Sequence, residues 1–189
     1  MKANRLIRLI PNILTTANML LGILVLFIVI CQKGEANRLA SCIMILIAVG
    51  LDCLDGMMAK SFNAESPLGK QLDSFADFVS FGLAPLAVLL THNSFRDLGL
   101  IMYLSVSFYA ISAAYRLARF NTGDFADFFL GLPITAAGFI LTSTNLVLHF
   151  YAVSGRPFAV MPVIVLIYIL SVLMASRIKI YRPSFRKKR

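Results

Sequence analysis

Charged residues are scarce in this sequence, where Asp, Glu, Lys and Arg make up only 14% of 189 residues and hydrophobic residues make up 59%. Soluble domains average about 25% charged residues, so this composition excludes an ordinary soluble domain of this length. A window of about 20 residues, the length that crosses roughly 30 Å of hydrocarbon, finds six apolar segments. They span approximately residues 13–31, 39–60, 70–91, 98–115, 131–151 and 158–176.

The predicted fold is an all-α integral membrane protein, in which six transmembrane helices form one bundle and one domain over residues 1–189. The first apolar segment is longer than the apolar core of a signal peptide, so we expect it to remain as the first helix. Cysteine is also rare. Cys31, Cys42 and Cys53 are odd in number and lack paired metal-ligand spacing, which favours packing residues over a disulfide or a zinc site.

Acidic residues are scarcer than basic ones. The sequence has nine Asp and Glu residues against 18 Lys and Arg residues, which gives a net charge of +9. Six helices would place both termini on one side of the membrane, and 14 of the basic residues would then lie on that side against four on the other. The positive-inside rule therefore predicts cytoplasmic termini. We expect the basic tail at residues 177–189 to lie against anionic lipid headgroups and predict no nucleic-acid partner.

Four of the nine acidic residues fall inside the second and third predicted spans: Asp52, Asp55, Asp73 and Asp77. A carboxylate at the centre of a span costs roughly 2.5–3.5 kcal/mol on insertion scales, so such residues mark candidate functional sites. Each pair is spaced by three or four residues and lies on one stripe of its helix. Ser66 is placed to cap the third helix, so we expect the second and third helices to form an antiparallel hairpin. In that hairpin the four carboxylates would converge near the cytoplasmic interface.

Four converging carboxylates repel one another and lose hydration, and a bound cation resolves this conflict. Oxygen ligands select hard ions, so we expect one or two Mg²⁺, Mn²⁺ or Ca²⁺ ions and no zinc. Polar contacts between helices would be the favoured interpretation for one such Asp but not for four. The small residues Gly56, Ala59 and Gly69 beside the acids either leave room for a ligand or let helices pack closely.

These residues resemble the pattern D-x₂-D-G-x₂-A-R-x₈-G-x₃-D-x₃-D of the CDP-alcohol phosphotransferase family. Every spacing and seven of eight identities agree, at Asp52, Asp55, Gly56, Ala59, Gly69, Asp73 and Asp77, with Lys60 in place of the Arg. Lys60 keeps the positive charge but loses the planar fork that pairs with phosphate.

The resemblance implies that an acceptor hydroxyl group attacks the lipid-linked phosphorus of a CDP-lipid and releases CMP, with Mg²⁺ or Mn²⁺ as cofactor. It implies that Asp52, Asp55 and Asp73 are metal ligands and that Asp77 is both a ligand and the general base. It also implies that Gly56, Ala59, Lys60 and Gly69 surround the CDP-lipid.

Outside this motif the sequence is most similar to the phosphatidylserine synthase branch of the family. The similarity lies in Pro11, Asn12, Thr15, Asn18 and Gly22, in residues 72–82, and in residues 116–121 and 131–133. It implies CDP-diacylglycerol and L-serine as substrates. Glycerol phosphate or an inositol-type acceptor is the alternative within the family, and a cation transporter is the alternative from another class.

The candidate acceptor-binding residues are Arg116, Arg119 and Asn121, at the end of the fourth helix. The two guanidinium groups could bind the serine carboxylate or a lipid phosphate, or serve only as positive-inside anchors. Asn12, Thr15 and Asn18 either face the same cavity or form hydrogen bonds between helices. We further expect a homodimer in a bacterial cytoplasmic membrane, with the active site facing the cytoplasm.

Overall fold

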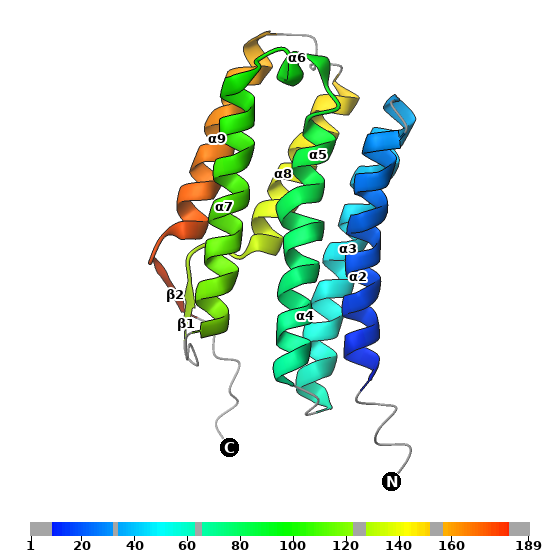
Figure 1. Cartoon of the computed structure of the whole chain (residues 1–189), viewed down its shortest axis with the longest axis vertical. Helices are drawn as coiled ribbons and strands as arrows, with labels where there is room; N and C mark the ends of the chain where they lie inside the picture. Colours follow the sequence, from blue (N-terminus) through cyan, green and yellow to red (C-terminus); the bar gives the residue numbers. More distant parts are fainter. Residues whose placement is uncertain (1–8, 32–33, 63–65, 123–127, 152–156, 182–189) are drawn as a thin grey trace.

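The computed structural model describes residues 9–31, 34–62, 66–122, 128–151 and 157–181, and its long helices run side by side along one axis (Figure 1). The helices are α2 (Ile10–Cys31), α3 (Glu35–Ser61), α4 (Pro67–Asp77), the π-helical segment η1 (Phe78–Leu83), α5 (Ala84–Leu89), α6 (Asn93–Arg96), α7 (Leu100–Thr122), α8 (Ile134–Phe150) and α9 (Pro157–Ala175). Two short strands, β1 (Phe128–Leu130) and β2 (Lys179–Tyr181), pair in antiparallel orientation.

All six predicted apolar segments are helical, and the prediction of a helical integral membrane protein is confirmed. Four stretches are long and apolar enough to cross a membrane: Ile10–Cys31, Ala36–Ser61, Pro67–Leu89 and Leu100–Thr122. Helix α8 has 17 residues, and the described apolar part of α9 is also shorter than these four. Six crossings therefore remain a prediction.

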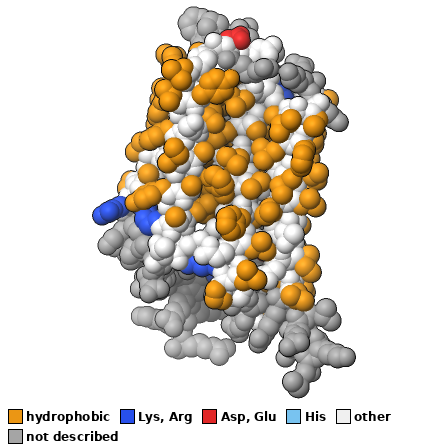
Figure 2. Space-filling view, viewed as in Figure 1, with side chains coloured by type: hydrophobic (Ala, Val, Ile, Leu, Met, Phe, Trp, Pro, Cys, Tyr) orange, Lys and Arg blue, Asp and Glu red, His pale blue; other side chains and the backbone are white. Residues whose placement is uncertain are grey.

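The outer faces of the helices are apolar, and the polar groups point inward. On α2 the buried stripe contains Thr15 and Asn18, whereas Leu20, Leu24 and Phe27 are exposed. Figure 2 shows apolar side chains over most of one face, with basic side chains mainly toward its lower end. Lipid tails accept an apolar surface of this kind, while interior polar groups can contact other helices.

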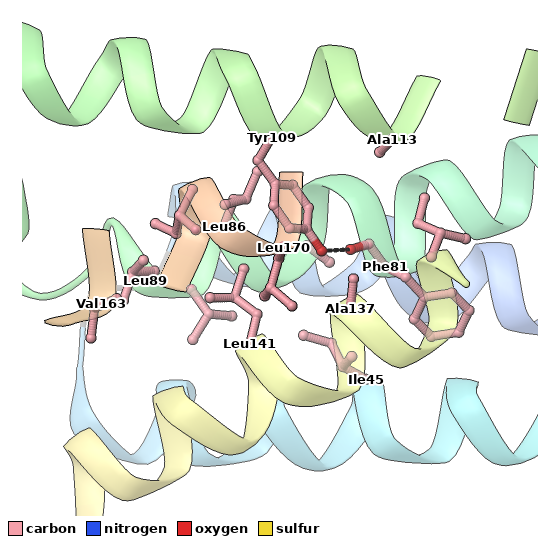
Figure 3. Close-up of a cluster of buried hydrophobic side chains, with 14 of the residues drawn as sticks. Ile45, Phe81, Leu86, Leu89, Tyr109, Ala113, Ala137, Leu141, Val163 and Leu170 are labelled. Carbon is pink, nitrogen blue, oxygen red and sulfur yellow. Dashed lines mark hydrogen bonds between the residues drawn. The ribbon is translucent and has the colours of Figure 1, made fainter. Parts of the chain in front are cut away.

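The core lies where η1 meets α3, α7, α8 and α9 (Figure 3). Ile45, Phe81, Tyr109, Leu141 and Leu170 are each at most 2% exposed there. The Tyr109 hydroxyl group donates a hydrogen bond of 3.4 Å to the Phe81 carbonyl oxygen. The core therefore holds the backbone that directly follows the acidic residues of α4.

The π-helical turn in η1 was not predicted, because the sequence pattern indicated one continuous helix over residues 70–91. Pro85 explains part of the irregularity, since it has no N–H group to donate to the Phe81 carbonyl four residues earlier. The Tyr109 hydroxyl group donates a hydrogen bond to that carbonyl oxygen. Turns of this kind often lie at functional sites, and this one begins directly after Asp77.

Two glycines allow α2 and α8 to approach η1 closely. A Cβ atom on Gly22 would lie 2.9 Å from the Cα atom of Ser80, and one on Gly138 would lie 2.6 Å from the Cβ atom of Phe81. The Ser80 hydroxyl group donates a hydrogen bond of 2.9 Å to the Asn18 carbonyl oxygen. These contacts fix the depth of η1 in the bundle.

The first and last described residues lie at the same end of the bundle, and His92 follows α5 near the opposite end (Figure 1). His92 is 1% exposed, and its Nδ1 atom lies 3.4 Å from Nη1 of Arg38. Burial, together with the charges of Arg38 and His149, lowers the pKa of His92 to about 4. The basic residues from position 182 onward lie outside the described residues.

Candidate active site

The carboxyl groups of Asp52, Asp55 and Asp73 converge as predicted. Each offers one oxygen atom, and these three atoms lie within 4.8 Å of one another. Asp52 and Asp55 belong to α3 and Asp73 belongs to α4, so two separate helices build the cluster. Helix α2 packs against both of them, while the backbones of α3 and α4 make fewer close contacts with each other. The side chains, more than the backbones, therefore meet between these helices.

The start of α4 has the predicted cap. Ser66 is the N-cap residue, its Oγ atom accepts a hydrogen bond of 3.0 Å from the Gly69 N–H group, and Pro67 opens the helix. The cap fixes where α4 begins, and it thereby sets which face of the helix carries Asp73 and Asp77.

The two motif glycines have different surroundings. A Cβ atom on Gly69 would lie 3.0 Å from the Oδ1 atom of Asn12, so this glycine allows α4 to pack closely against α2. A Cβ atom on Gly56 would meet nothing within 4 Å, and Gly56 is exposed beside Asp55. Open space at Gly56 favours room for a ligand there, whereas Gly69 also has a packing role between α4 and α2.

Asp55 is held by a residue of α2. The Thr15 Oγ1 atom lies 2.7 Å from Asp55 Oδ2 and 3.0 Å from the Pro11 carbonyl oxygen. A hydroxyl group has one hydrogen, and donation to the ionised carboxylate forms the stronger bond. Thr15 therefore orients Asp55 and joins α2 to α3. The two roles that the sequence left open, facing the site and bonding between helices, are combined in this one contact.

Asp77 lies next to this three-residue cluster. Its carboxyl group is within hydrogen-bonding reach of Asp52, it is 9% exposed, and its Oδ1 atom has no hydrogen-bond partner among the described residues. The three mutually close ligand atoms include none from Asp77. Asp77 is thus buried beside the cluster, as is Asp55 within it.

Of the three predicted acceptor-binding residues, only Arg116 faces the acids in the described structure. It is 8% exposed, and its charge attracts Asp77 and Asp52. Arg119 instead donates hydrogen bonds of 3.1 and 2.9 Å to the carbonyl oxygens of Ala175 and Ser176, at the end of α9.

Asn121 and Lys70 join α7 to α4 at the end of the bundle that carries the acids. Asn121 Nδ2 donates a hydrogen bond of 2.9 Å to Ser74 Oγ, and Lys70 Nζ donates one of 3.1 Å to the Phe120 carbonyl oxygen. Lys60 is exposed on the last turn of α3, and Ala59 beside it is half-buried. Asn121 and Lys70 thus link α7 to the helix that carries Asp73 and Asp77.

The donor set suits a divalent metal ion. It consists of carboxylate oxygens from two helices, which hard cations prefer, and a buried Oδ1 atom of Asp77 lies beside it without a hydrogen-bond partner in the described chain. The sequence had placed Thr15 either in this cavity or in a hydrogen bond between helices, but it did not identify Asp55 as the partner.

Comparison with known proteins agrees with this site. A family model described as CDP-alcohol phosphatidyltransferase matches residues 8–177. The CDP-diacylglycerol–serine O-phosphatidyltransferase of Bacillus subtilis is 33% identical over 181 residues, which cover 94% of this chain and 92% of that protein. The protein of the same name from Helicobacter pylori strain 26695 is 30% identical over 95% of this chain and 73% of its own length.

An archaeal relative extends the comparison. The archaetidylserine synthase of Methanothermobacter thermautotrophicus is 33% identical over 174 residues, which cover 90% of this chain and 68% of that protein. The similarity to the phosphatidylserine synthase branch is confirmed by these relatives. Because the family model matches nearly the whole sequence, the chain belongs to the CDP-alcohol phosphatidyltransferase family.

Proposed function

We propose that this protein transfers the phosphatidyl group of CDP-diacylglycerol to the hydroxyl group of L-serine, which forms phosphatidylserine and releases CMP. The observation that carries the proposal is the convergence of Asp52, Asp55 and Asp73 within 4.8 Å, in a chain of this family. Serine as the acceptor is supported by the names of the relatives from Bacillus subtilis and Helicobacter pylori.

The reaction exchanges one phosphorus–oxygen bond for another. The serine hydroxyl oxygen bonds to the lipid-linked phosphorus, the bond from that phosphorus to CMP breaks, and the hydroxyl proton passes to a base. Asp77 is the proposed base, because it lies beside the cluster and its buried Oδ1 atom has no hydrogen-bond partner in the described structure. Arg116 attracts Asp77 and Asp52, and it offers a positive charge for the serine carboxylate or a phosphate group.

The carboxylates of Asp52, Asp55 and Asp73 would hold the metal, with Asp77 as a further ligand. When bound, Mg²⁺ or Mn²⁺ neutralises phosphate charge and aligns the reacting oxygens. Thr15 orients Asp55 for this task through its hydrogen bond of 2.7 Å. Gly56, Ala59, Lys60 and Gly69 would line the CDP-lipid, with the open space at Gly56 as the support.

The proposed enzyme is a single domain of six crossings, in which the site and both termini face the cytoplasm. The first and last described residues lie at one end of the bundle, toward which the basic side chains also gather. A bacterial cytoplasmic membrane and a homodimer complete the proposal, since two-fold assemblies are the commonest form of oligomer.

A panel of acceptors tests the function. Purified protein is given CDP-diacylglycerol, Mg²⁺ or Mn²⁺, and one of L-serine, glycerol 3-phosphate or inositol, and CMP is measured. We expect release with serine only. No release with any acceptor would refute the enzyme, whereas release with glycerol 3-phosphate but not serine would refute only the choice of acceptor.

A further inference from the structure

Asn18 on α2 is a buried polar residue whose side chain makes no hydrogen bond in the described structure. It is 0% exposed, and both its Oδ1 and Nδ2 atoms lack a hydrogen-bond partner among the described residues. Buried amide groups in folded proteins are rarely left in this state. The side chain therefore indicates a binding partner that is not part of the described chain.

The position of Asn18 connects it to the acidic site. Thr15, one turn earlier on the same buried stripe, donates to Asp55, and Gly22, one turn later, lies against Ser80. The Asn18 carbonyl oxygen accepts a hydrogen bond from the Ser80 hydroxyl group. Asn18 thus lies on α2 between the turn that contacts Asp55 and the turn that contacts η1.

Asp77 lies in the same region of the bundle and also has a buried polar atom without a hydrogen-bond partner in the described structure. It precedes Ser80 by three residues, so it lies about one helical turn from the contact with Asn18. Its Oδ1 atom is also buried without a hydrogen-bond partner in the part of the chain that is described. Helices α2 and α4, which pack against each other, therefore each carry a buried polar group with an atom that has no hydrogen-bond partner in the described structure.

We infer that the Asn18 side chain binds the acceptor amino acid. The Oδ1 atom would accept a hydrogen bond from the serine ammonium group, and the Nδ2 group would donate one to the serine carboxylate or hydroxyl oxygen. This inference rests on the proposed function, because a serine whose hydroxyl group reaches Asp77 must have its other groups close to that base.

The chemistry of Asn18 suits a zwitterion. A neutral amide supplies one acceptor and two donors without adding charge, so it can satisfy an ammonium and a carboxylate group together. A phosphate-bearing acceptor would instead call for several cations, and in the described structure Arg119 is engaged by the end of α9. Because water does not reach the Asn18 amide, serine must displace the side chains that cover it.

Asn145 on α8 provides a matched control. It is equally enclosed, at 1% exposed, but its Nδ2 atom donates hydrogen bonds to the carbonyl oxygens of Pro85 and Leu141, at 3.0 and 3.1 Å. Asn145 thus has a structural role between α8 and α5 that the Asn18 side chain lacks.

The test compares Asn18→Ala with Asn145→Ala in purified protein. We expect Asn18→Ala to raise the KM for serine by about tenfold or more, with the KM for CDP-diacylglycerol changed less than about threefold. Serine should also stabilise the wild type against heat, with CDP-diacylglycerol present, and stabilise Asn18→Ala much less. Asn145→Ala should lower the thermal midpoint and leave the serine KM unchanged. Asn18→Ser, which retains one small polar group, replaces the alanine variant if that variant does not fold.

The outcomes separate the two claims. An unchanged serine KM in the Asn18 variant, or equal rises in both KM values, overturns the role of Asn18 while the wild type still uses serine. A wild type that releases CMP with another alcohol but not with serine overturns the proposed acceptor, and the inference about Asn18 falls with it.

Discussion

A single methyl group at Gly22 should move the π-helical segment that follows Asp73 and Asp77. In Gly22→Ala the new Cβ atom would lie 2.5 Å from the Oγ atom of Ser80, 2.9 Å from its Cα atom and 3.0 Å from its backbone nitrogen. The hydroxyl group can rotate away only by giving up its hydrogen bond to the Asn18 carbonyl oxygen. The backbone atoms cannot rotate away, so α2 and η1 must separate.

The size of the effect follows from these distances. Carbon atoms prefer about 3.5–4.0 Å, so the helices must separate by roughly 0.6–1 Å. Overpacking of this kind costs about 1–3 kcal/mol, and the lost hydrogen bond costs about 1 kcal/mol more. Replacing Gly by Ala within a helix returns about 1 kcal/mol, which leaves a net loss of about 1–3 kcal/mol.

Thermal unfolding in detergent and CMP release measure the two consequences. For a chain of this size the net loss corresponds to a midpoint lowered by about 2–12 °C. Turnover should fall by about tenfold to 10²-fold at a temperature where the variant is folded, because a displacement near 1 Å in a catalytic site has effects of that order. Gly50→Ala on α3 is the control, since a Cβ atom there meets nothing within 4 Å. If Gly22→Ala proves as stable and as active as Gly50→Ala, the close approach of α2 to η1 is refuted.

Further variants test the acids and the far end of the bundle. Asp77→Asn should lose at least about 10²-fold in turnover at saturating metal while the variant still binds CDP-diacylglycerol, and near-normal turnover would exclude Asp77 as the base. Asp52→Asn should instead weaken metal and nucleotide binding. Thr15→Val should weaken metal affinity about 10–100-fold in a metal titration of activity, because Asp55 loses its donor, and an unchanged titration would contradict this. The pKa of His92 is lowered to about 4 from 6.5, so its contribution to stability is complete above about pH 6.5 and is lost as the pH falls toward 4. Thermal midpoints of the wild type should fall more steeply over that range than those of His92→Gln, and parallel curves would contradict the assignment.

The location of the helices and the pairs of acids that share a helix face could be predicted because both are local properties. Long apolar runs specify membrane helices, and spacings of three and four residues place Asp52 with Asp55 and Asp73 with Asp77. Ser66 and Pro67 mark the start of α4 through a cap that needs only four residues.

The features that escaped prediction depend on partners distant in the sequence. The π-helical turn lies where Tyr109 of α7 donates to the Phe81 carbonyl oxygen, to which Pro85 cannot donate. The guanidinium group of Arg119 binds carbonyl oxygens at the end of α9, more than fifty residues away, so its sequence position could not distinguish that role from acceptor binding. Local periodicity does not encode such contacts, since they arise only when helices pack.

The lipid product itself gives the most direct test of the account. Purified protein is incubated with CDP-diacylglycerol, isotopically labelled L-serine and Mg²⁺ or Mn²⁺, and both labelled phosphatidylserine and CMP are quantified before and after a chelator removes the metal. The account predicts one labelled phosphatidylserine for each CMP released, loss of both products with the chelator, and recovery of both when the metal is restored. Release of CMP without labelled lipid, or product formation that persists after the metal is removed, would contradict it.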